Sequence, residues 1–79
     1  MNAIPAKPVW NYTAEQAQVY LAQGQTCRAA AIYRRLTVKD PSVENLTMLA
    51  GIYMLQGLDT DAIALHVRIS KIERAGLVQ

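Results

Sequence analysis

The side chains in this sequence that could do covalent or acid–base chemistry are few and far apart. Cys27 is the only cysteine and His66 is the only histidine. A thiolate is favoured at the start of a helix, where Cys27 is expected, but no base is spaced to pair with it. We therefore expect a structural or incidental role for Cys27. We expect His66 to be a packing residue, with a pH-sensitive contact as the alternative.

Motifs for metal, phosphate or general acid–base chemistry are missing from the sequence. No group of His, Cys, Asp or Glu residues has the spacing of metal ligands, and no glycine-rich loop could bind a phosphate. No pair of carboxylates is placed for acid–base catalysis. The sequence therefore predicts a protein that is not an enzyme and uses no cofactor or metal.

Composition and charge narrow the class of protein further. A chain of 79 residues forms one domain at most and buries a small core, so a partner or self-association would add stability. Hydrophobic residues make up 52% and Phe is absent, which favours close-packed helices. The net charge of +2 is too small to indicate nucleic acid. The sequence has one cysteine, no signal-peptide pattern and no apolar run long enough to cross a bilayer. These features predict a cytoplasmic protein outside the membrane.

Part of the sequence repeats itself 33 positions later. Four residue types keep the same spacing in both copies: Ala17, Tyr20, Gly24 and Ala29 become Ala50, Tyr53, Gly57 and Ala62. A period of this length indicates a supersecondary unit used twice, each unit too small to bury its own apolar face. We therefore look for function on the surface that the stacked units create.

Helical periodicity and capping residues predict four helices and no strand. The expected helices span about 13–23, 27–36, 43–56, and from 59 or 60 to 74. Thr13, Thr26 and Ser42 stand where an N-cap side chain is expected. Gly24 and Gly57 are expected to end the first and third helices, and Ala75-Gly76 the fourth.

The repeated pattern resembles the tetratricopeptide repeat (TPR). The first copy matches through Ala17, Tyr20, Gly24, Ala29, Tyr33, Leu36 and Pro41. The second copy matches through Leu46, Leu49, Ala50, Tyr53, Gly57, Ala62 and Ile69. The period is one residue short of the usual 34. Thr13 and Gln16 stand where the family prefers large apolar residues, and His66 where it prefers an aromatic.

The resemblance covers about residues 10–75 and implies an all-α fold. It predicts two antiparallel helix-turn-helix units, about 10–42 and 43–75, in a right-handed stack of four helices. An extended segment, 1–9, would precede this domain, and a short tail, 76–79, would follow it. A weaker resemblance connects the chain with small TPR-like chaperones of bacterial secretion systems.

In the TPR family the first helix of each unit lines a concave groove that binds a partner. The resemblance assigns this groove to Asn11, Ala14, Gln18, Leu21 and Ala22 in unit one, and to Glu44, Thr47, Gly51, Met54 and Leu55 in unit two. Their spacing places each set on one face of a helix. The alternative is that these side chains are core residues or contact another copy of the chain.

The third helix is apolar nearly all round, and such a helix must be covered on every side. Another protein, or a second copy of this chain, is the simplest way to cover this helix. The resemblance and this pattern predict an adaptor or small chaperone that binds an amphipathic helix or apolar peptide, or a homo-oligomer. Trp10, with Val9, either staples the first helix or anchors a partner.

The alternative function is a helix-turn-helix DNA-binding regulator that uses the segment from Gly57 to Arg74. Ile63, Ala64, Val67, Ile69 and Ser70 resemble that motif, but Arg68 stands where its turn usually has glycine. An unbroken helix is therefore the simpler prediction. The basic residues of the second and fourth helices could meet phosphates or form a solvated outer face. Nucleic acid is not the expected partner.

Overall fold

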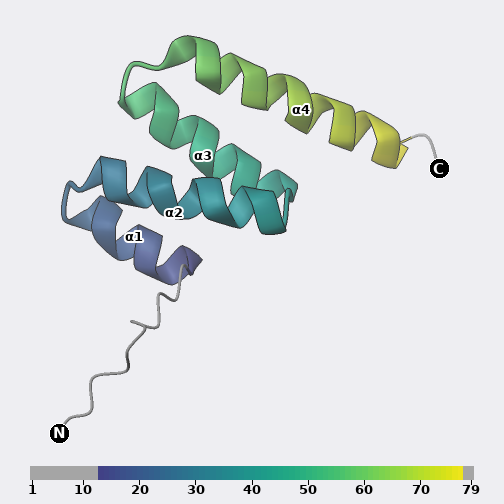
Figure 1. Cartoon of the computed structure of the whole chain (residues 1–79). Coiled ribbons are helices and arrows are strands. Elements are labelled where there is room, and N and C mark those ends of the chain that lie inside the picture. The colour runs from purple at the N-terminus through teal and green to yellow at the C-terminus, as the bar shows by residue number, and fades with distance from the viewer. Residues whose placement is uncertain (1–12, 78–79) are drawn as a thin grey trace, which may run out of the picture.

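The computed structural model describes residues 13–77, apart from the side chain of Leu77, and it is all-α (Figure 1). The helices are α1 (Ala14–Ala22), α2 (Thr26–Lys39), α3 (Val43–Leu55) and α4 (Asp59–Leu77). No strand occurs between residues 13 and 77. The prediction of an all-helical chain of four helices is confirmed. The predicted segment 1–9, Val9, Trp10 and Asn11 lie outside the described residues.

Polar side chains start two of the helices as predicted. The Thr13 hydroxyl accepts a hydrogen bond from the Gln16 amide at 3.1 Å, and the Ser42 hydroxyl accepts one from the Asn45 amide at 3.1 Å. Each bond satisfies a backbone donor that has no partner within its helix. The prediction for Thr26 is wrong, because α2 already includes it and its N-cap, Gln25, makes no side-chain capping bond.

Glycine ends α1 and α3 with the same backbone geometry. Gly24 and Gly57 have φ angles of 76° and 77°, in the left-handed region that favours glycine. The residue after each glycine donates its amide to the carbonyl five positions earlier, at 2.8 Å in both turns. This is the Schellman arrangement of a helix C-terminus. The sequence repeat is therefore also a repeat of backbone hydrogen bonds.

The second and fourth helices run further than predicted. α2 continues to Lys39 and stops at Asp40, which precedes Pro41 and leaves helical geometry. α4 continues to Leu77, so Ala75-Gly76 does not end it and residues 76–77 do not form a tail. Gly76 does not adopt a positive φ angle. Without that left-handed turn, a glycine near the end of a helix weakens it but does not terminate it.

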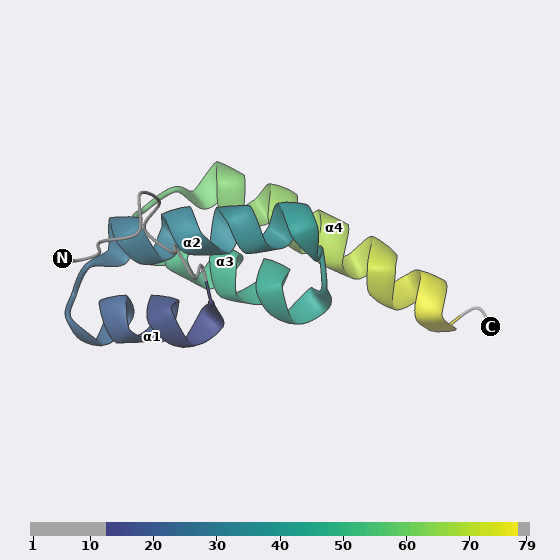
Figure 2. The ribbon, with the colours of Figure 1, turned by 60° about the horizontal axis from the view of Figure 1, so that its bottom comes forward.

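The helices pack in chain order. α2 contacts α1 and α3, and α4 contacts α3, whereas no Cα atom of α1 lies within 8 Å of one in α3. Figure 1 shows α2 between α1 and α3, with α4 on the far side of α3. In both Figure 1 and Figure 2 the C-terminal part of α4 extends beyond the other helices. The order α1–α2–α3–α4 therefore leaves α1 and α4 as end helices.

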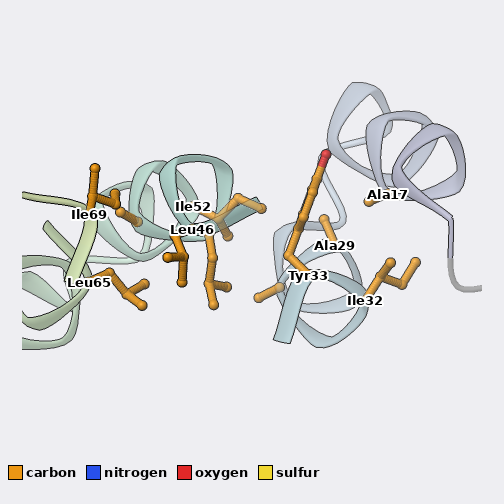
Figure 3. Packing of buried hydrophobic residues seen from close by; sticks show 11 residues of the cluster. Ala17, Ala29, Ile32, Tyr33, Leu46, Ile52, Leu65 and Ile69 are labelled. Carbon is orange, nitrogen blue, oxygen red and sulfur yellow. The ribbon is translucent and has the colours of Figure 1, made fainter. Parts of the chain in front are cut away.

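Small residues lie where the helices approach one another. Ala17, Ala29, Ala50 and Ala62 are at most 2% exposed, which confirms their predicted place between paired helices. Figure 3 shows side chains of neighbouring helices turned toward one another, including Leu65 and Ile69 of α4 near Leu46 and Ile52 of α3. The other buried hydrophobic residues are Ala30, Ile32, Tyr33 and Leu49.

Replacement of a buried alanine by leucine should therefore destabilise the fold. We expect Ala29→Leu to lower the free energy of unfolding by about 1–3 kcal/mol, because Ala29 is 0% exposed and added methyl groups would separate α2 from its neighbour. Ala64→Leu, at an exposed position of α4, is the matched control and should change stability little. Urea unfolding followed by circular dichroism measures both. Equal effects would contradict the packing described here.

Candidate protein-interaction surfaces

The predicted groove residues lie on the outside of two separate helices. Leu21 is half-buried, and the exposed members are Ala14, Gln18 and Ala22 of α1 and Glu44, Thr47, Gly51, Met54 and Leu55 of α3. Asn11 lies outside the described residues. No Cα atom of α1 lies within 8 Å of one in α3, so the two sets lie on helices without close backbone contact. The exposure rules out the alternative that most of these side chains belong to the core of this chain.

One groove residue is tied to the core by a hydrogen bond. The Gln18 Nε2 atom donates to the Tyr33 Oη atom at 2.9 Å. Tyr33 is 2% exposed, and its hydroxyl points toward α1 in Figure 3. A buried tyrosine needs a partner for its hydroxyl, and Gln18 supplies it. Gln18 thus joins α1 to α2, a role that the groove prediction did not include.

The C-terminal end of α3 carries two neighbouring apolar side chains that nothing in the described part of the chain covers fully. Met54 is 59% exposed and Leu55 is 76% exposed. One turn earlier, a Cβ atom added to Gly51 would have no heavy atom within 4 Å. We call Glu44, Thr47, Gly51, Met54 and Leu55 the α3 surface. The sequence predicts that α3 is apolar nearly all round and needs a partner to cover it. The exposure of Met54 and Leu55 shows that the described part of the chain leaves the C-terminal end of α3 uncovered.

Two hollows lie along α4. One, of about 420 Å³, is lined by Met54, Asp59, Ala62, Ile63 and His66. The other, of about 430 Å³, is lined by Ile63, His66, Val67, Ser70, Lys71 and Arg74. The hollows share Ile63 and His66, so they lie next to one another along α4. We call the exposed α4 residues that line the two hollows the α4 face: Asp59, Ile63, His66, Val67, Ser70, Lys71 and Arg74.

Sequence reasoning missed the α4 face, although the repeat contained the signal. The residues of α2 at the equivalent positions, Ala30, Tyr33 and Thr37, are 0%, 2% and 7% exposed. Their counterparts 33 positions later are Ile63, His66 and Ser70, which are all exposed. The reason is that α2 has a helix on each side, whereas within residues 13–77 the one helix close to α4 is α3. The positions that are buried in unit one therefore mark the face that the end helix leaves exposed in unit two.

The predicted packing role of His66 is wrong within this chain. His66 is exposed and lines both hollows. The equivalent residue of unit one, Tyr33, is buried because α2 lies between two helices. His66 therefore belongs to a surface that a partner could cover rather than to the core.

Cys27 is exposed, and its contact is structural. The Gln56 Nε2 atom donates to the Cys27 Sγ atom at 3.4 Å, which links the start of α2 to the end of α3. Within residues 13–77, no group of three or more His, Cys, Asp or Glu side chains could hold a metal ion. In the same part of the chain, no helix combines the length and apolar character that crossing a membrane requires.

The segment proposed for DNA binding is one continuous helix. α4 runs from Asp59 to Leu77 without the turn that a helix-turn-helix motif requires near Arg68. The basic residues of the second and fourth helices are exposed: Arg28, Arg34, Arg35, Lys39, Arg68, Lys71 and Arg74. Arg28 lies over the Tyr20 ring, with its guanidinium carbon 5.6 Å from the ring centroid, a cation–π contact within unit one.

Comparisons with protein-family models, with curated proteins and with solved structures gave no significant match.

The α3 surface should accept a charge without loss of the fold. Because Leu55 is 76% exposed, we expect Leu55→Glu to change the free energy of unfolding by no more than about 0.5 kcal/mol. Leu46 is 0% exposed in the same helix, and Leu46→Glu should abolish cooperative unfolding because it buries a carboxylate without a partner. Thermal unfolding followed by circular dichroism separates the two. If Leu55→Glu unfolded the chain as well, Leu55 would be a core residue.

Proposed function

We propose that this chain is a non-enzymatic protein-interaction module, an adaptor or small chaperone, that binds an amphipathic helix or apolar peptide of another protein on the α3 surface. The observation that carries this proposal is the exposure of Met54 and Leu55, at 59% and 76%, at the end of a helix fixed by the core. Exposed neighbouring apolar side chains on a rigid element are a feature of peptide-binding sites. Met54 can adapt its shape to different partners.

The row of residues along α3 favours a helical partner. Thr47, Gly51, Met54 and Leu55 have the spacing of one helix face. Gly51 carries no side chain and has open space around it, so a partner backbone could approach closely there. Glu44 supplies a negative charge in the first turn of α3. The partner that fits best has apolar side chains for Met54 and Leu55 and a basic side chain near Glu44.

The resemblance to the TPR family supports this function, since that family binds peptides with the first helix of each unit. The weaker resemblance to secretion-system chaperones suggests an aggregation-prone subunit as the partner. An exposed unpaired Cys27 is compatible with a reducing compartment, so the proposal places the protein in the cytoplasm.

A synthetic helix tests the proposed site directly. The probe is a fluorescent amphipathic peptide of about 16 residues, roughly 24 Å long as a helix, with a leucine stripe and a lysine near one end. We expect a saturable rise in fluorescence anisotropy with the native chain. Leu55→Glu and Met54→Glu should each weaken binding at least about tenfold, because each places a charge against the leucine stripe.

Val38→Glu is the matched control, because Val38 is an apolar residue of α2 that is 84% exposed and lies outside the α3 surface. It should retain the affinity of the native chain within about twofold. Equal weakening by all three substitutions would show that the peptide binds any exposed apolar side chain. The proposed site would then be wrong.

A further inference from the structure

The α4 face has opposite charges at its two ends. Asp59 lies in the first turn of α4, whereas Lys71 and Arg74 lie toward its C-terminus. Between them are Ile63 and Val67, which are 62% and 49% exposed. An apolar centre with an acidic end and a basic end is the pattern that a surface needs in order to pair with an inverted copy of itself.

We propose that two copies of this chain pair through their α4 faces, with the two α4 helices antiparallel across a two-fold axis. In this arrangement Asp59 of each copy lies opposite Arg74 of the other. The same axis passes between His66 and Val67 and places Ile63 opposite Ser70. Asp59 and Arg74 are 15 positions apart, so the ion pairs bracket a contact about 22 Å long.

Helix electrostatics favour the same orientation. The N-terminus of a helix carries partial positive charge and its C-terminus partial negative charge, so antiparallel neighbours attract each other. A parallel pair would place Asp59 beside Asp59 and Arg74 beside Arg74, which is repulsive. The charge order along α4 thus selects the antiparallel pair over the parallel one.

The shape of the fold also leaves room for a second copy. α4 has 19 residues against 13 in α3, and none of its described side chains is buried after Ile69. The end of α4 extends away from the other helices in Figures 1 and 2. The α4 face thus continues past the part of α4 that packs against α3. A dimer of this kind leaves Leu55, on α3, available to another protein.

Light scattering coupled to size-exclusion chromatography tests the dimer. We expect the native chain of 8.7 kDa to elute at twice that mass at about 100 µM and low salt, and to dissociate as salt screens the ion pairs. Asp59→Arg and Arg74→Glu should each weaken dimerisation at least about tenfold, because each places like charges opposite one another at both ends. The double variant Asp59→Arg/Arg74→Glu should restore it.

Matched controls locate the contact on the α4 face. Asp61 and Arg68 are exposed residues of α4 that do not line either hollow. Asp61→Arg and Arg68→Glu make the same charge changes, and we expect both variants to remain dimeric. Circular dichroism of every variant verifies that α4 is still folded.

Cysteine cross-linking gives a readout that does not depend on charge. In a Cys27→Ser background, Val67→Cys should form a disulfide-linked dimer on mild oxidation because Val67 lies beside the axis. Arg68→Cys, one residue away but outside the hollows, should not form this cross-link.

The proposal is overturned if the native chain stays monomeric at about 100 µM in low salt. It is also overturned if the double variant fails to dimerise, or if Arg68→Cys cross-links as well as Val67→Cys.

Discussion

Between residues 13 and 77, close backbone contacts join only helices that are consecutive in the chain, so the contact between α2 and α3 joins the two units. α1 reaches the rest of the fold through α2, and α4 reaches it through α3. The buried alanines and the two Schellman turns serve this arrangement, because they let consecutive helices lie close and reverse direction within a few residues. Among the described residues, the same constraint leaves each end helix with a face that no other helix covers.

The repeat and its local chemistry were predictable from the sequence. Thr13, Ser42, Gly24 and Gly57 each act through bonds to residues a few positions away, so their roles do not depend on the rest of the fold. The close approach at Ala17 and Ala29 was predictable for a similar reason, since small residues at helical spacing mark a packed face. The TPR-like packing of the units and the partner remain predictions.

Other features depend on neighbours that the sequence pattern does not identify. His66 and Tyr33 occupy equivalent positions, yet Tyr33 is buried and His66 is exposed. In the part of the chain that the structure describes, α2 has two neighbouring helices and α4 has one. The end of α4 at Leu77 was missed because Gly76 keeps helical geometry there, while Gly57 turns the chain. Burial at the end of a stack is therefore decided by what lies beside the residue and not by its type.

The α3 surface and the α4 face differ in the partner they favour. The α3 surface has one acidic residue, Glu44, and two strongly exposed apolar side chains at its other end, so it lacks the symmetry that pairing with itself would require. The α4 face carries Asp59 at one end and Arg74 at the other, which matches its own inverted copy. The proposed dimer covers the hollow that Met54 lines but leaves Leu55 of each copy exposed, so a partner with two apolar helices could contact both Leu55 side chains of one dimer. A small chain of this kind could thus act as a bivalent adaptor, with α4 supplying the assembly and α3 the recognition.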